Sequence, residues 1–264
     1  MKVVFLTGSH PRHAFMARAI AATGHLCGLV IEKREAFVPE PPAGLPADTE
    51  TLFRQHFEKR DAAEARHFGD ATLPDAAQYH VDMANLNTPQ TVTFINAQTP
   101  DLVLSYGVHK LAPETLGGID CPLKWNIHGG LSPWYRGVTT HFWPSYFLEP
   151  RLTGMTVHEL TQAIDGGDIL HQSAAELVRG DGLHDLACRA VMALGNDMAG
   201  LLATVADGRL TAPHRQATTG RIWRSVDWRP EHLHLIYQHY GDHIVDLCLE
   251  GVLGQVAPRL IRQF

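Results

Sequence analysis

The sequence predicts an α/β fold that is built on a mostly parallel β-sheet. The chain opens with a short apolar run at residues 3–6, continues with apolar residues at helical spacing up to Gly24, and enters a second β-rich run at residues 26–31. A strand, a helix and a strand in this order form a βαβ unit, whose two strands lie parallel. Strands and helices then keep alternating, and a chain of 264 residues that is 45% hydrophobic is large enough to bury a full core.

The remaining elements follow from apolar periodicity and from turn residues. Helices are expected at residues 51–68, 88–97, 113–116 and 183–205 and from Pro230 onward, and strands at residues 102–105, 123–128, 154–160, 169–177 and 221–224. The proline-rich stretch and charged helix between residues 36 and 75 are expected to form either a surface insertion or a lid over an acceptor site. We divide the chain into a catalytic domain, residues 1–210, and a small C-terminal extension, residues 211–264.

The composition argues against several classes of protein. The net charge of −6 leaves no basic stripe for neutralising phosphates, so a nucleic-acid partner is not expected. The four cysteines lie far apart and lack Cys-x-x-Cys spacing, which favours buried thiols in a reducing compartment over zinc or disulfides; they are Cys27, Cys121, Cys188 and Cys248. The N-terminal apolar run stops at Thr7 without a cleavage signature or a membrane-length span. We therefore expect a soluble, cytoplasmic protein without a membrane partner.

The most informative polar residues lie at the end of the expected strand at residues 123–128. The period of two in a strand places Asn126 and His128 on one face and Trp125 and Ile127 on the other. The polar pair then shares a pocket, while its neighbours pack in the core. Two glycines follow, which stop the strand and allow a ligand to approach the backbone closely.

Acyl transfer requires an oxyanion donor, a base and a group that orients the base, and this region offers a candidate for each. Asn126 is the candidate amide donor, His128 the candidate proton carrier, and Asp165, in a glycine-rich loop, the candidate orienting carboxylate. Each residue also has a purely structural alternative, because a strand-end Asn, a core or surface His and a turn Asp are all common. On the residues alone, Asp168 is a rival to Asp165.

The region contains four motifs, which read Asn126-x-His128, Leu131-Ser132-Pro133-x-x-Arg136-Gly137, Gly154-x-Thr156-Val157-His158 and Asp165-Gly166-Gly167. Together with the upstream stretches at residues 100–107 and 111–116, they resemble the folate-dependent formyltransferase family. That family includes the glycinamide ribonucleotide, methionyl-tRNA and nucleotide-sugar formyltransferases. The resemblance covers about residues 100–175 and implies the Rossmann-like, doubly wound sheet of the formyltransferase fold. It further implies formyl transfer from 10-formyltetrahydrofolate, as co-substrate, to a primary amine, and it favours Asp165 over Asp168.

The resemblance and the first turn of the chain together indicate which residues contact the ligands. The folate-contacting set is expected to be Tyr106, Gly107, Val108, Gly166 and Gly167. The acceptor-contacting set is expected to be Ser9, His10, Arg136, Gly137 and His158. Backbone amides at the start of a helix favour an anion near Ser9 and His10, with a plain helix cap at Ser9 as the alternative. A structural salt bridge is the alternative for Arg136, and packing or support of Asp165 is the alternative for His158.

The chain departs from the family pattern at two places, and both concern the acceptor. Gly129-Gly130 replaces the Pro-Ser or Ala-Ser that commonly follows the histidine, and Gly8-Ser9-His10-Pro11 replaces the Gly-Ser-Asn turn of glycinamide ribonucleotide formyltransferases. The changed first turn, the acidic charge and the short extension together favour an amino-sugar nucleotide as the acceptor, and Gly129-Gly130 is expected to reshape the acceptor wall.

Several alternatives stay open beside this hypothesis. They are a glycinamide ribonucleotide formyltransferase-like enzyme, a 10-formyltetrahydrofolate hydrolase, and a non-catalytic folate- or nucleotide-binding module on the same fold. The C-terminal part holds four clustered histidines, His232, His234, His239 and His243. No metal is expected there, because no carboxylate-histidine motif of known spacing lies beside them. A homodimer is an open alternative for the assembly.

Overall fold

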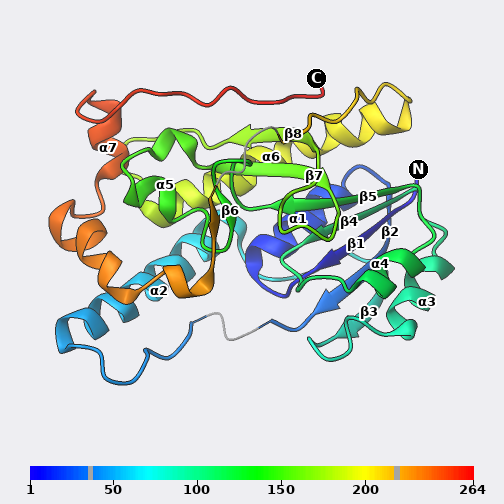
Figure 1. The fold of residues 1–264 in the computed structure, drawn as a ribbon, viewed down its shortest axis with the longest axis horizontal. Coiled ribbons are helices and arrows are strands. Elements are labelled where there is room, and N and C mark those ends of the chain that lie inside the picture. The colour runs from blue at the N-terminus through cyan, green and yellow to red at the C-terminus, as the bar shows by residue number, and fades with distance from the viewer. Residues whose placement is uncertain (35–37, 217–220) are drawn as a thin grey trace.

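The computed structural model, which describes residues 1–34, 38–216 and 221–264, contains a seven-stranded sheet with the order β3-β2-β1-β4-β5-β7-β8 (Figure 1). The strands are β1 Val3–Thr7, β2 Leu26–Glu32, β3 Ala77–Val81, β4 Leu102–Tyr106, β5 Leu123–His128, β7 Gly154–Glu159 and β8 Ile169–Ala174. The first five pair in parallel, while β7 runs antiparallel to β5 and to β8. The mostly parallel α/β sheet expected from the sequence is confirmed.

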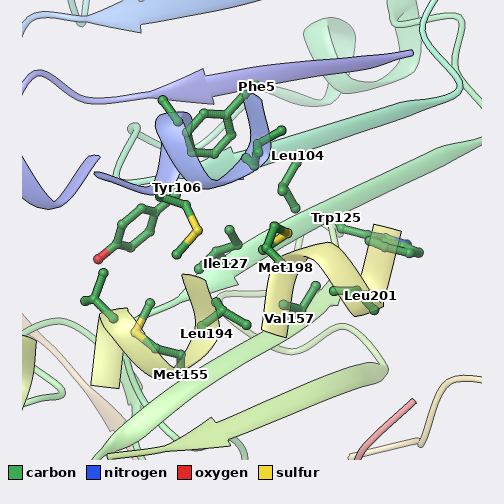
Figure 2. Packing of buried hydrophobic residues seen from close by; sticks show 14 of the residues in the cluster. Phe5, Leu104, Tyr106, Trp125, Ile127, Met155, Val157, Leu194, Met198 and Leu201 are labelled. Carbon is green, nitrogen blue, oxygen red and sulfur yellow. The ribbon is translucent and has the colours of Figure 1, made fainter. Parts of the chain in front are cut away.

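Helices cover both faces of the sheet, as in a doubly wound fold. One face packs against α1 Pro11–Ala21, α2 Ala47–Phe68 and α6 Leu183–Ala206, and the other against α3 Pro89–Ala97 and α4 Pro113–Gly118. Figure 2 shows the larger core, in which Trp125 and Ile127 of β5 lie beside Met198 and Leu201 of α6. The expected orientation of these two β5 side chains is therefore observed. By length and composition α6 could cross a membrane, but its apolar side is part of this core.

The segment between β2 and β3 differs from the expected insertion. Its helix α2 begins at Ala47, four residues before the expected start, and is followed after residues 69–76 by β3, which pairs in parallel with β2. The segment is thus the crossover connection of a βαβ unit. The sequence reasoning missed β3 because this edge strand is largely exposed and only Val81 is fully buried.

The C-terminal residues pack on the rest of the chain. A two-stranded sheet joins β6 Arg136–Gly137 to β9 Ile222–Trp223. The helix expected from Pro230 is a 3-10 turn, Pro230–His232, followed by a π-helix, His234–His239, and by α7 Ile244–Leu249. A third hydrophobic cluster joins this part to α2 and to the short helices α5 Trp143–Tyr146 and Pro150–Leu152; its members include Leu52, Phe53, Trp143, Trp223, Leu233, Ile236 and Ile244.

Candidate active site

A cavity of about 460 Å³ opens at the carboxyl ends of β4 and β5. This edge is where parallel α/β sheets place their ligand sites, because the connecting loops diverge there. Its walls come from the first turn of α1, from α2 and α6, from residues 137–142 and from Trp228 of the C-terminal part. The residues Asn126, His128 and Asp165, which the sequence singled out, all line this cavity.

Asn126 is held by a neighbour on each side of its amide. Its Oδ1 accepts a hydrogen bond of 2.7 Å from the Ser105 hydroxyl, and its Nδ2 lies 3.1 Å from Nε2 of His158. The other ring nitrogen of His158 lies 2.8 Å from the carbonyl oxygen of Glu159, so it carries the proton and leaves Nε2 as the acceptor. The second N–H of the Asn126 amide has no protein acceptor among the described residues, and it can donate to a ligand in the cavity.

His128 is buried between a backbone carbonyl and a carboxylate. Its Nε2 lies 2.6 Å from the carbonyl oxygen of Tyr135, and its Nδ1 lies 3.4 Å from Oδ2 of Asp165. Burial lowers the pKa of His128, whereas Asp165 and the Tyr135 carbonyl oppose that shift. The resting imidazole is therefore neutral near pH 7, with its proton on Nε2. A second proton at Nδ1 would be stabilised by the carboxylate.

Asp165 joins the two histidines. Besides its contact with His128, its Oδ1 lies 3.5 Å from Nε2 of His158, and its Oδ2 accepts a hydrogen bond of 2.8 Å from the N–H of Gly137. Burial raises the pKa of Asp165, but the positive charge of His128 and His158 in their protonated forms and the Gly137 N–H outweigh burial and lower it to about 2. Asp165 is ionised at every physiological pH.

Two glycines are required by the close packing around these groups. A Cβ atom on Gly130 would lie 2.4 Å from the Tyr135 carbonyl oxygen and 2.7 Å from Nε2 of His128. A Cβ on Gly137, whose φ is +95°, would lie 2.0 Å from the carbonyl oxygen of Trp223. Gly130 thus has a physical reason in this chain: a side chain there would displace the ring of His128.

The other expected contact residues divide into two groups. Tyr106, Gly107, Val108 and Gly137 line the cavity. The residues that do not line it are Ser9, His10, Arg136, His158, Gly166 and Gly167. Ser9 is exposed, and the cap of α1 is His10, so the alternative of a Ser9 cap is wrong. His158 is 2% exposed and lies behind Asn126 and Asp165, where it positions both side chains.

The structure adds wall residues that the sequence reasoning did not single out. The first turn of α1 contributes Arg12 and His13, and Gly107 leaves the space for His13, because a Cβ there would lie 2.2 Å from the His13 ring. From α2 come His56, Arg60 and Glu64, with Glu64 paired to Arg12. The sequence signal that could have identified the three α2 residues is their spacing of four, which places their side chains on one face of the helix.

Two of the four histidines of the C-terminal part have hydrogen-bonding partners among the described residues. Nε2 of His234 lies 2.9 Å from the Thr49 hydroxyl, and Nδ1 of His232 accepts from the N–H of Arg229 at 3.1 Å. Within the described ranges, no group of three or more His, Cys, Asp or Glu side chains is placed to hold a metal ion. All four cysteines are free thiols.

Comparison with known proteins gives three results. A family model described as formyl transferase matches residues 43–196, more than half of the chain. The chain is 30% identical over 115 residues to the bifunctional polymyxin resistance protein ArnA of Wigglesworthia glossinidia brevipalpis, covering 42% of this chain and 17% of that protein. It is 30% identical over 139 residues to methionyl-tRNA formyltransferase of Acetivibrio thermocellus, covering 51% and 44%. The alignments thus span less than half of the length of these curated relatives.

Solved structures share the fold. Phosphoribosylglycinamide formyltransferase of Anaplasma phagocytophilum superposes with a TM-score of 0.56 at 18% identity, covering 85% of this chain and 97% of that one. An N-formyltransferase of Helicobacter canadensis, solved with folinic acid and dTDP-3-aminofucose, superposes with a TM-score of 0.54 at 12% identity, covering 91% and 82%. At these identities the likeness establishes the architecture.

Proposed function

This chain belongs to the formyl transferase family, and we propose that it transfers the formyl group of 10-formyltetrahydrofolate to a primary amine of a small acceptor. The observation that carries this proposal is the meeting of Asn126, His128 and Asp165 at one end of a cavity, with His158 holding two of them in place. An amide donor, an imidazole and an ionised carboxylate are the groups that acyl transfer to an amine requires.

Asn126 is the proposed oxyanion donor. When the amine nitrogen bonds to the formyl carbon, the carbonyl oxygen gains negative charge, and a fixed N–H aimed at it lowers the barrier. Ser105 and His158 fix the orientation of the amide, so that its remaining N–H is set before the substrates arrive. This donor does not have to reorganise during the reaction.

His128 and Asp165 are the proposed proton carriers. The amine loses one proton as its bond to the formyl carbon forms, and the folate nitrogen gains one proton as its bond to that carbon breaks. Nδ1 of His128 can accept the proton because it is unprotonated and faces the Asp165 carboxylate. Asp165 can also hold a water between the amine nitrogen and the folate nitrogen. The products are a formamide and tetrahydrofolate, so atoms and charge balance.

The proposed acceptor is an amino-sugar nucleotide. Three guanidinium groups, those of Arg12, Arg34 and Arg60, line the cavity and would favour a phosphorylated acceptor. The Helicobacter canadensis relative of the same fold was solved with a sugar nucleotide of this kind. The net charge of −6 argues against a tRNA acceptor. We propose a cytoplasmic location.

The test is a formyl-transfer assay with purified protein, 10-formyltetrahydrofolate and a panel of amines that includes amino-sugar nucleotides and glycinamide ribonucleotide. We expect formyl-amine formation, detected by mass spectrometry, and a fall of about 10²-fold or more in kcat for His128→Ala. His80→Ala, at an exposed edge-strand position, is the matched control and should keep wild-type turnover. Formate release without an amine product would instead indicate a hydrolase, and folate binding without turnover would indicate a binding module.

A further inference from the structure

The C-terminal part of the chain reaches the loop that carries Asp165. His214 and Ile169 exchange two backbone hydrogen bonds, of 2.7 and 2.8 Å, which fasten residues near 214 to the start of β8. Two residues further on, the amide of Gln216 faces the loop. Gln216 lies outside residues 43–196, the part of the chain that matches the family model, whereas the Asp165 loop lies inside it.

The side chain of Gln216 binds two backbone carbonyls of the loop. Its Nε2 donates one hydrogen bond of 2.7 Å to the carbonyl oxygen of Asp165 and a second of 2.7 Å to the carbonyl oxygen of Gly167. Both N–H groups of the amide are thus used on two carbonyls that flank Gly166. The opposite amide orientation would set the Gln216 oxygen against both carbonyl oxygens, so the geometry requires the donor.

The backbone of Asp165 needs such support. Its φ is +44°, in the left-handed region that is unfavourable for residues with a side chain. A residue persists there only when its surroundings hold it. The side chain of Asp165 accepts a hydrogen bond from the N–H of Gly137, and Gly137 belongs to strand β6, which pairs with β9 of the C-terminal part. The backbone and the side chain of Asp165 are therefore both supported from the same distant segment.

We propose that Gln216 is a positioning residue, which holds the loop of Asp165 so that the carboxylate faces His128 and His158. This inference rests on the proposed formyl transfer for its catalytic consequence, but the positioning can be measured without substrate. Gln216 does not line the cavity, so its effect passes through Asp165 rather than through a ligand contact.

The test compares Gln216→Met with wild type. Methionine has a similar length but no N–H, so both bonds to the loop are lost. Gln90→Met is the matched control, because Gln90 is exposed on α3 on the other side of the sheet. Gln216→Glu is a second variant: its carboxylate cannot donate and repels the two carbonyls, so it should speed hydrogen exchange in the loop more strongly than Gln216→Met, whereas its added negative charge opposes a fall in the pKa of His128. Thermal unfolding midpoints verify that each variant folds.

The first readout is the NMR titration of the His128 ring without ligands. The groups that face this ring are Asp165, His158, Arg136 and His141. Asp165 is the charged group among them that raises the pKa of His128, beside the Tyr135 carbonyl, so when Gln216→Met lets the carboxylate move away, that pKa should fall below its wild-type value. Amide hydrogen exchange at residues 165–167 should become faster. Unchanged titration and exchange in both variants would overturn the proposal.

The second readout is turnover. We expect kcat to fall by about ten- to a hundredfold, while the KM for the amine changes by less than about twofold, because a misplaced group weakens the transition state more than substrate binding. The acid limb of the pH profile of kcat in Gln216→Met should move to lower pH, as in Asp165→Asn, because the pKa of His128 falls in both variants. An inactive wild-type protein would refute the proposed function, and the NMR titration would still decide the positioning role. Wild-type kcat in both Gln216 variants would refute the inference alone.

Discussion

Replacing Asp165 by Asn should change how the stability of the fold depends on pH. The pKa of Asp165 is about 2 in the folded chain, against 3.8 for an ordinary aspartate. At about 1.4 kcal/mol per pH unit, this difference corresponds to about 2 kcal/mol of stability at neutral pH. The side chain is only 14% exposed, so solvent screening reduces this value little.

The sign follows from the direction of the pKa change. Because folding lowers the pKa of Asp165, the contribution is present above the unfolded pKa and is lost as the pH falls through the folded value of about 2. Linkage predicts that about 1 kcal/mol of it is lost between pH 7 and pH 3. The amide introduced by Asp165→Asn cannot titrate, so this variant should lack the loss.

The assay is equilibrium urea unfolding of both proteins at a series of pH values between 7 and 3. The titration of His128, whose pKa Asp165 raises, is measured by NMR in both proteins and its contribution is subtracted. The free energy of unfolding of the wild type, minus that of Asp165→Asn, should then decrease by about 1 kcal/mol over this range. A difference that stays constant within error over the whole range would refute the reasoning, since it would mean that the carboxylate gains nothing from His128, His158 and Gly137.

Two further predictions concern glycine packing and charge in the cavity. Gly137→Ala should destabilise the chain by more than about 2 kcal/mol in urea unfolding, because it combines a positive φ with a Cβ 2.0 Å from a carbonyl oxygen. The control is Gly24→Ala, which has a positive φ but no atom nearby and should cost about 1 kcal/mol. Equal losses of stability in the two variants would contradict the role of the clash. Arg60→Met should raise the KM for a phosphorylated amine about tenfold and leave that for an uncharged amine within about twofold, as measured by initial rates. Burial and Arg12 lower the pKa of Arg60 to about 10, so it is still a cation at pH 7, and equal effects on both amines would argue against its contact with the acceptor.

Most of the fold could be predicted because most helices and strands show a recognisable apolar pattern within their own residues. The strand at residues 123–128 has the expected bounds, and the helix expected at residues 183–205 ends one residue later. Both segments are buried on a continuous face, and burial is what apolar periodicity reports. Strand β3 was missed for the opposite reason, since an exposed edge strand carries little apolar signal.

The candidate site could be predicted only in part. Asn126 and His128 are two residues apart, so strand geometry places them together as soon as the strand is identified. Asp165 was chosen over Asp168 by a family resemblance rather than by physics, and the structure places Asp165 beside both histidines. The contribution of α2 to the cavity was left open, because a charged helix in the sequence does not reveal what lies against its polar face.

By itself, the sequence determined the α/β fold and the strand that places Asn126 and His128 on one face. These features depend on residues that are close along the chain, where periods of two and 3.6 translate directly into geometry. Only the tertiary structure decided that His158 orients Asn126, that Gly137 binds the Asp165 carboxylate and that Gln216, 51 residues beyond Asp165, holds its loop. Such contacts join segments whose local patterns are independent of one another, and only their packing around a shared core brings them within hydrogen-bonding distance.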